Sequence, residues 1–195
     1  LECKSHFMQK PVLTSQLQAT AMTFKMHKNL ANLNLEDLKQ CAPEQLQTHS
    51  VSAVLLALGS NYQAEKYLPR AREQLAALGE IQLSTAFQNP DFTATPELPK
   101  PDYTNQCVYL TLTSDITLQQ LQQSFKRLES DCGRQRCSES IKNPIKKVAM
   151  DIDILLIKLD DRKNSLSKEW IIMADRYPFK THERAGIEEL LLSGL

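Results

Sequence analysis

Hydrophobic positions follow a regular pattern along this chain from about residue 50 onward. A continuous apolar run over 51–58 ends at Gly59-Ser60-Asn61, which predicts a strand followed by a turn. Apolar residues between 68 and 78 recur at helical spacing, and Gly79 follows them as a C-cap. Residues 81–85 then alternate in a way that predicts a second strand.

The second half of the chain repeats this order of elements. Apolar and polar residues alternate over 108–113, which predicts a half-buried strand. Thr117 is expected to cap a helix with one apolar face, and Gly133 to end it. Residues 150–157 predict a fourth strand. The order β-α-β-β-α-β predicts an α+β fold: a ferredoxin-like sandwich with helices packed on an antiparallel sheet. Many functions share that order, so function has to be argued from the site.

Residues 1–49 lack this regularity. They contain no glycine and are rich in Gln, Asn and Lys, although Asn34 is placed to cap a short helix beginning at Leu35. We therefore expect a polar N-terminal extension over residues 1–49, weakly helical or disordered, followed by one domain over residues 50–195. A loop with four prolines, 89–102, is expected between the second and third strands.

Composition narrows the class of protein. Of 195 residues, 42 % are hydrophobic and 24 % charged, as in soluble globular domains. The 23 basic residues balance 23 acidic ones, which argues against a polybasic nucleic-acid binder. No apolar run approaches the ~20 residues of a membrane helix. We expect a cytoplasmic monomer with reduced cysteines and with neither a membrane nor a nucleic-acid partner. The scattered glycines exclude a Gly-rich phosphate loop.

The sharpest chemical signal is the sequence Asp151-Ile152-Asp153-Ile154 in the fourth predicted strand. Residues two apart on a strand share a face, so both carboxylates are expected to point together, away from the two isoleucines. Like charges that close repel unless a cation offsets them, and Mg²⁺ prefers such oxygen ligands. A solvated strand face is the alternative reading of the same pattern.

A basic segment precedes these aspartates. Residues 126–148 hold seven basic and three acidic residues, a net charge of +4. Arg134 and Arg136 lie just after the predicted helix and enter the loop that leads to Asp151. Cations beside a carboxylate pair are what phosphoryl transfer needs, because they neutralise charge that develops on phosphate oxygens. An ordinary solvated charge cluster remains the alternative.

Five short motifs occur in one order along the chain. They are Leu58-Gly59-Ser60-Asn61, Pro101-Asp102-Tyr103-Thr104-Asn105, Glu129 with Gly133-Arg134-Gln135-Arg136, Asp151-Ile152-Asp153-Ile154-Leu155-Leu156, and His182-Glu183-Arg184-Ala185. Over about residues 51–186 the chain resembles the 6-hydroxymethyl-7,8-dihydropterin pyrophosphokinase family of folate biosynthesis. That resemblance implies a ferredoxin-like α+β fold and transfer of diphosphate from ATP to the pterin hydroxymethyl group, with AMP released.

The resemblance also implies roles for ten residues, together with two Mg²⁺ ions and the substrates ATP and 6-hydroxymethyl-7,8-dihydropterin. The implied metal ligands are Asp151 and Asp153, which with Arg134 form the catalytic set. The implied pterin contacts are Asn61, Tyr103 and Asn105. The implied ATP contacts are Glu129, Arg136, Lys147 and Arg184.

Several positions depart from the family pattern. Val148 stands where the family has an arginine before the first metal aspartate, and Lys147 is the nearest substitute, although lysine lacks the bidentate fork. The segment 138–143 has no aromatic residue where a tryptophan is usual. The ATP-contacting histidine of a Pro-His pair is missing around Pro178, and Gly186 replaces an aromatic that stacks on the pterin. The domain is also expected to be short at its C-terminus.

Three functional hypotheses follow. The first is a divergent pyrophosphokinase, and the second is a catalytically impaired homologue that keeps a pterin or nucleotide pocket. Each lost transition-state contact costs ~10²–10³ in rate, so three losses could leave no measurable turnover. The third is an RNA- or protein-binding module of the same fold. The strand over 108–113 carries Tyr109 but not the paired aromatics of an RNA-recognition motif, which disfavours the third.

Overall fold

A computed structural model describes residues 33–91, 94–134, 147–160 and 170–192. The chain divides into a compact unit, Asn34–Leu190, and a second unit of residues 1–33 and 191–195, of which only residues 33, 191 and 192 are described. The compact unit holds a seven-stranded sheet in the order β1-β7-β6-β2-β5-β3, with β4 also paired to β5. No helix among the described residues combines the length and apolarity needed to span a membrane.

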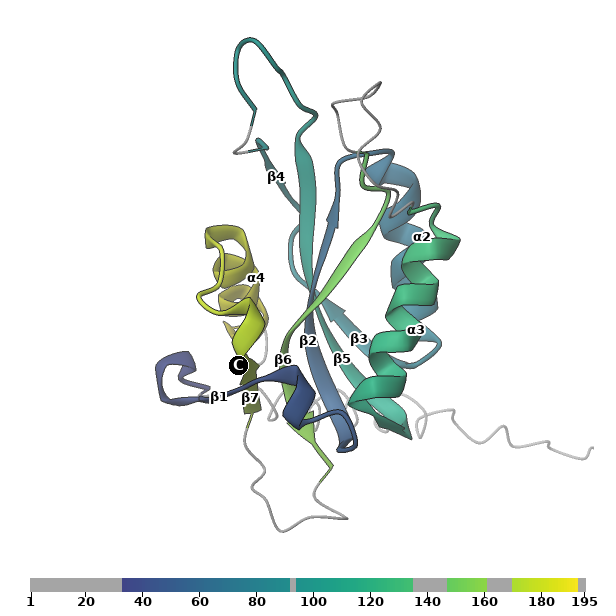
Figure 1. The fold of residues 1–195 in the computed structure, drawn as a ribbon, viewed down its shortest axis with the longest axis vertical. Helices are drawn as coiled ribbons and strands as arrows, with labels where there is room; N and C mark the ends of the chain where they lie inside the picture. Colours follow the sequence, from purple (N-terminus) through teal and green to yellow (C-terminus); the bar gives the residue numbers. More distant parts are fainter. Residues whose placement is uncertain (1–32, 92–93, 135–146, 161–169, 193–195) are drawn as a thin grey trace, which may run out of the picture. The chain divides into compact units, whose positions relative to one another are not determined.

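Three α-helices flank this sheet in the described part of the chain. The strands are β1 (Lys39–Cys41), β2 (Ser50–Ser60), β3 (Gly79–Leu83), β4 (Phe87–Asn89), β5 (Tyr103–Thr117), β6 (Asp151–Leu159) and β7 (Trp170–Met173). The helices are α2 (Ala64–Ala76), α3 (Leu118–Asp131) and α4 (Thr181–Leu192), with 3-10 turns η2 (Leu35–Asp37), η3 (Pro43–Gln45) and η4 (Ala174–Arg176). Helices α2 and α3 cover one face of the sheet, and α4 lies on the other (Figure 1).

The elements predicted between residues 50 and 160 are confirmed. The chain runs β2-α2-β3-β5-α3-β6, with ends within a few residues of those expected, and β4 is a short addition. Five of the six described strand pairings are antiparallel, whereas β1 and β7 pair in parallel. The α+β class is therefore confirmed, and the wholly antiparallel sheet is wrong at this edge pair. The ferredoxin-like assignment stays a prediction.

Helix α3 forms as its sequence predicts. The Thr117 hydroxyl accepts a hydrogen bond from Gln120 N, and Gln120 Oε1 accepts one from Thr117 N, so both ends of a capping box are made. Leu121, Phe125 and Leu128 are buried at helical spacing against the sheet. The helix ends at Asp131, and Gly133 follows with φ +83°, a left-handed conformation that glycine adopts without strain.

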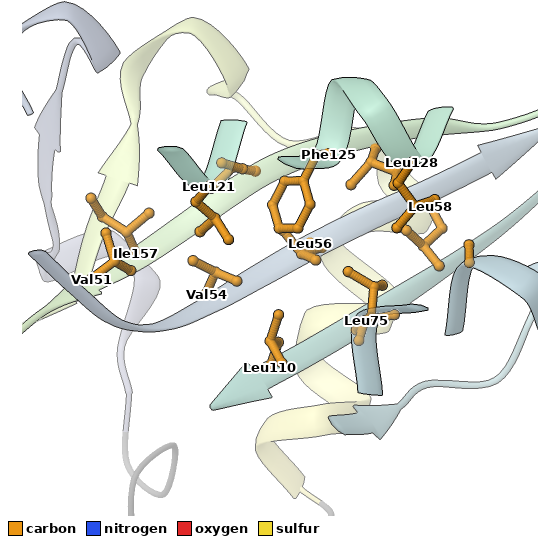
Figure 2. Packing of buried hydrophobic residues seen from close by; sticks show 14 of the residues in the cluster. Val51, Val54, Leu56, Leu58, Leu75, Leu110, Leu121, Phe125, Leu128 and Ile157 are labelled. Atoms are coloured by element: carbon orange, nitrogen blue, oxygen red, sulfur yellow. The ribbon is translucent and has the colours of Figure 1, made fainter. Parts of the chain in front are cut away.

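The main core lies between this face of the sheet and helices α2 and α3 (Figure 2). Leu56 and Leu58 of β2 pack there with Leu75 of α2 and Phe125 of α3. Along β6, the residues that face this core are even-numbered at first, Ile152 and Ile154, and then odd-numbered, Ile157 and Leu159. Leu55 pairs with Leu156 but the next residue, Leu56, pairs with Ile154, so a β-bulge inserts one extra residue. Beyond the bulge β6 is almost entirely buried, whereas before it alternate residues stay half-exposed.

Residues 34–49, within the expected N-terminal extension, belong to the compact unit. The predicted cap is confirmed, because Asn34 Oδ1 accepts a hydrogen bond from Glu36 N at 3.3 Å. Strand β1 adds to the sheet beside β7, and Leu46 is buried in the main core. The predicted boundary at residue 50 therefore does not coincide with the start of this unit, and residues 1–32 lie outside the described residues.

A glycine allows α4 to approach the opposite face of the sheet closely. A Cβ added at Gly186 would lie 2.5 Å from Cys107 Sγ and 2.9 Å from Cys107 Cβ on β5. The Cys107 thiol is buried by this close approach. Its pKa is raised to about 12, mainly by burial and further by the charges of Glu183 and Glu189. Ile187 and Leu190 are buried on the same helix.

Gly186→Ala should therefore destabilise the protein by ~1–3 kcal/mol through overpacking. Helix propensity alone predicts the opposite sign, because alanine is favoured over glycine by ~1 kcal/mol. Urea unfolding followed by fluorescence of Trp170, the only tryptophan in the chain, measures the difference. Ala185→Gly, at an exposed position of α4, reports helix propensity alone. A Gly186→Ala protein more stable than wild type would refute the close contact.

Candidate active site

Asp151 and Asp153 lie at the start of β6 with their carboxylates on one face of the strand. Ile152 and Ile154 are in the core under α3, so the alternation of the strand turns both aspartates the other way. This confirms the predicted same-face arrangement. Their side chains are 36 % and 28 % exposed, which leaves both accessible to a ligand.

The two carboxylates repel each other in a partly buried setting. The pKa of Asp153 is raised to about 6, first by burial and then by the charge of Asp151, although Arg176 and Lys180 act in the opposite direction. The charged form of Asp153 is thus disfavoured unless cations offset it. In the described structure one arginine forms an ion pair with each aspartate.

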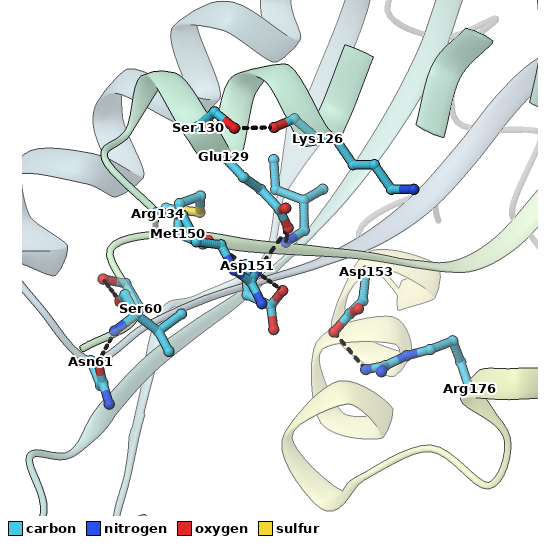
Figure 3. Close-up of polar contacts among 12 residues, drawn as sticks. Ser60, Asn61, Lys126, Glu129, Ser130, Arg134, Met150, Asp151, Asp153 and Arg176 are labelled. Atoms are coloured by element: carbon cyan, nitrogen blue, oxygen red, sulfur yellow. Dashed lines mark hydrogen bonds and ion pairs between the residues drawn. The ribbon is translucent and has the colours of Figure 1, made fainter. Parts of the chain in front are cut away.

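Arg134 holds Asp151 at the end of α3. Its Nη1 donates to Asp151 Oδ1, to Glu129 Oε1 at 2.9 Å and to Met150 O at 3.2 Å (Figure 3). Burial lowers the pKa of Arg134, but the hydrogen bond and charge of Asp151, with the charge of Glu129, outweigh it and raise the pKa above its usual value. Glu129 is only 3 % exposed, and its Oε1 also accepts from Ile152 N at 2.9 Å. One carboxylate therefore fixes both the arginine and the strand that bears the aspartates.

Arg176 of η4 holds Asp153 from the other side. Its Nη2 lies 2.7 Å from Asp153 Oδ2 (Figure 3). The same nitrogen lies 3.1 Å from Glu183 Oε1. Glu183 is buried on α4, and its second oxygen accepts from Lys180 N at 2.8 Å. Arg176 was not among the site residues predicted from the sequence. The available signal was its position just before Tyr177-Pro178, where the family pattern has a Pro-His pair.

The sheet register places Asn105 beside this pair. Gly59 of β2 pairs with Asn105 of β5 on one side and with Asp151 of β6 on the other. A Cβ built at Gly59 would lie 3.1 Å from Asn105 Oδ1 and 4.0 Å from both Asp151 Cβ and Tyr103 Cδ1. Burial, with the charges of Asp91 and Asp151, raises the pKa of the Tyr103 hydroxyl. Two predicted pterin contacts and a predicted metal ligand therefore lie around one bare glycine backbone.

A cavity of about 480 Å³ adjoins the aspartates. Within the described residues, β7 pairs only with 156–158 of β6, so the first half of β6 has an open edge. Side chains from both faces of the strand reach the cavity across this edge, including Ile154 from the core side and Asp153 from the other. Lys126, Glu129, Arg134 and Arg176 also line it.

Other predicted site residues lie elsewhere. Asn61 Oδ1 accepts from Val148 N at 2.6 Å, and Asn61 N donates to Val148 O at 3.0 Å, which anchors the segment before β6. The Lys147 ammonium lies 4.8 Å from the centre of the Tyr62 ring. Arg184 pairs with Glu36 at 2.7 Å and is half-exposed. None of these three lines the cavity, and Arg136 lies outside the described residues.

The donor set at Asp151 and Asp153 suits Mg²⁺. Mg²⁺ is usually held by one or two carboxylates together with water and substrate phosphates, rather than by a complete protein cage. Among the described residues no group of three or more His, Cys, Asp or Glu side chains is arranged to hold a metal ion, so a dedicated cage is absent there. A repelling carboxylate pair facing a cavity lined with cations fits the substrate-shared kind of site.

Comparison with known protein families decides the assignment. A family model described as 7,8-dihydro-6-hydroxymethylpterin-pyrophosphokinase (HPPK) matches residues 55–176. The chain belongs to the HPPK family. No curated protein matches the chain significantly. The matched range contains the aspartates, Asn105, Glu129, Arg134 and Arg176, so the HPPK match covers most of the site described above.

The structure gives reasons for two departures from the HPPK pattern. Val148 is 4 % exposed and is held through its backbone by Asn61, so a long charged side chain at this position would have to leave the core. Gly186 is fixed by the contact between α4 and Cys107, which leaves no room for an aromatic ring. Both substitutions are thus coupled to local packing.

The roles of Glu129 can be separated by two substitutions. Glu129→Gln keeps an oxygen that can accept from Ile152 N, whereas Glu129→Leu leaves that amide without its partner. We expect the leucine variant to lose ~1–3 kcal/mol of unfolding free energy and the glutamine variant less. Urea unfolding of each measures this, with Glu73→Leu on the exposed face of α2 as control. Equal losses for the two Glu129 variants would contradict the hydrogen bond to β6.

Proposed function

We propose that this chain transfers diphosphate from ATP to 6-hydroxymethyl-7,8-dihydropterin in folate biosynthesis, releasing AMP. Membership of the HPPK family supports the reaction class. The observation that carries the proposal is the row Asn105–Gly59–Asp151, in which adjacent strands hold an amide and a carboxylate on either side of a glycine. We also propose that the protein is a cytoplasmic monomer. Its only substrates in this proposal are ATP and the pterin.

The pterin is proposed to bind over Gly59. The Asn105 amide offers both a donor and an acceptor to the edge of the pterin ring, and Tyr103 supplies an aromatic wall. Because Gly59 has no side chain, the Asn105 amide can lie over the buried backbone there, where a Cβ would come within 3.1 Å of Asn105 Oδ1. The hydroxymethyl group would then point across the sheet from β2 toward Asp151 on β6. Asn61 is proposed as a further contact at the end of the same strand.

The triphosphate is proposed to lie along the cation-lined cavity. Asp151 and Asp153 would hold two Mg²⁺ ions, which when bound offset phosphate charge. Arg134 and Arg176, already beside the aspartates, can each turn a donor to a phosphate oxygen while Glu129 and Glu183 keep them in place. Lys126 extends from α3 on the same side as Glu129 (Figure 3). Arg136, Lys147 and Arg184 remain proposed ATP contacts.

The reaction is then an in-line displacement at the β-phosphorus. The pterin hydroxymethyl oxygen gives up its proton to solvent and forms a bond to this phosphorus as the bond to the oxygen bridging the α- and β-phosphates breaks, and AMP leaves with that oxygen. Fixed guanidinium groups stabilise the charge that develops on the phosphate oxygens, because they are oriented before the reaction begins. Arg134 is oriented by three acceptors and so is best placed for this role.

Incubation of the full chain with ATP, Mg²⁺ and 6-hydroxymethyl-7,8-dihydropterin should produce AMP and the pterin diphosphate in equal amounts. Asp153→Ala should lower the rate at least ~10²-fold, because one carboxylate cannot offset the cations and phosphates that two position. Chromatographic separation of ATP from AMP measures both. Glu80→Gln, exposed on β3, is the control and should match wild type. Pterin binding with no AMP formation would instead identify a catalytically impaired homologue.

Asn105→Ala should weaken pterin binding by about tenfold, as expected for the loss of paired hydrogen bonds to a ligand. Binding is measured by quenching of the pterin fluorescence. ATP affinity should stay within twofold of wild type, because Asn105 does not line the cavity. Gln88→Ala, exposed on the neighbouring strand β4, serves as the matched control. An unchanged pterin affinity in Asn105→Ala would remove Asn105 from the site.

A further inference from the structure

The cavity beside the aspartates has two chemically different ends. One end is lined by the paired charges of Asp151, Asp153 and Arg176. The other is lined by Pro43, Gln47 and the exposed Glu44, with Gln122 and Phe125 from α3. Residues 43–47 precede the residues that match the HPPK family, 55–176, so this end of the cavity is built partly by a segment outside the family match.

Helix α3 shows that the two ends are well separated. Glu129 contacts Arg134 and Ile152 N at the charged end, and Gln122 contacts Gln47 at the other. Seven residues of α-helix separate Glu129 from Gln122, a rise of ~10.5 Å. Lys126 lies between them and also lines the cavity. A nucleoside triphosphate laid along α3 with its phosphates at the aspartates therefore brings its base to the end with the two glutamines.

The segment 43–47 is held firmly in place. Leu46 is buried in the main core, and Gln47 O accepts a hydrogen bond from Gln119 N at 3.1 Å. Gln47 Nε2 donates to Pro43 O at 2.8 Å and to Gln122 Oε1 at 3.1 Å. The backbone of the segment and the Gln47 amide are therefore fixed before any ligand binds, which is the condition for selective recognition.

We infer that residues 43–47 and Gln122 form the nucleobase subsite of the cavity and select adenine over guanine. The inference rests on the proposed function, because it takes ATP as the ligand. Among the described residues, Gln47 Oε1 and Gln122 Nε2 have no hydrogen-bond partner, so the bonded pair offers one acceptor and one donor. Adenine presents a donor, its amino group, beside the acceptor N7, whereas guanine presents two acceptors there, O6 and N7. Guanine would thus set O6 against Gln47 Oε1.

Isothermal titration of the full chain with ATP and with GTP, each with Mg²⁺, tests this. Wild type should bind ATP at least about tenfold more tightly than GTP. Gln47→Leu and Gln122→Leu should each weaken ATP binding by about tenfold and bring the ratio of the two affinities close to one. The matched controls are Gln123→Leu, exposed beside Gln122 on α3, and Gln40→Leu, exposed on β1. Both should keep the wild-type ratio.

Pterin fluorescence quenching is measured on every variant and should be unchanged, which shows that each is folded. Should Gln47→Leu fail to fold, the Gln122→Leu variant carries the same test. A wild type that binds ATP and forms AMP but binds GTP equally well overturns the inference and leaves the proposed function standing. Variants that keep the wild-type ATP preference overturn it as well. A wild type that binds no ATP overturns both.

Discussion

The mutual repulsion of Asp151 and Asp153 is the constraint around which this structure is arranged. Two carboxylates on one face of a strand, each partly buried, are unfavourable unless cations lie close. Arg134 and Arg176 supply those cations from opposite sides, and each is held by a buried glutamate, Glu129 or Glu183. The end of α3, the start of α4 and the turn η4 are therefore tied to the first three residues of β6 by charge as well as by packing.

Two glycines, Gly59 and Gly186, allow the close packing around the site. At Gly59, which is buried, the absence of a side chain leaves room for the Asn105 amide, because a Cβ there would lie 3.1 Å from Asn105 Oδ1. At Gly186 the same absence lets α4 approach β5, which brings Glu183 to Arg176 and so completes the pairing of Asp153. The missing aromatic at position 186 thus goes with a close helix–sheet contact, and in the proposed function Tyr103 is the aromatic wall of the pterin site.

Features that depend on local periodicity could be predicted from the sequence. Features that depend on pairing at the edge of the sheet could not. Thr117, Gly133 and the alternation around Asp151 act within a few residues, so the helix α3, its end and the shared face of the aspartates were predictable. The parallel pairing of β1 with β7 depends on a contact between residues 39–41 and 171–173, which no local pattern encodes. Arg176 was missed for the same reason, because its partner Asp153 lies 23 residues away.

This chain has Val148 where the family pattern places a positive charge before the two aspartates. Lys147, next to Val148, is engaged with the Tyr62 ring and does not line the cavity. The cations that do line it come from three separate elements: Lys126 within α3, Arg134 after α3, and Arg176 in η4. The electrostatic potential at a bound phosphate depends on where the charges lie and not on which element carries them. Cations close to the cavity can therefore offset the missing positive charge at Val148. The segment before the aspartates is held by Asn61, whose Oδ1 accepts a hydrogen bond from Val148 N.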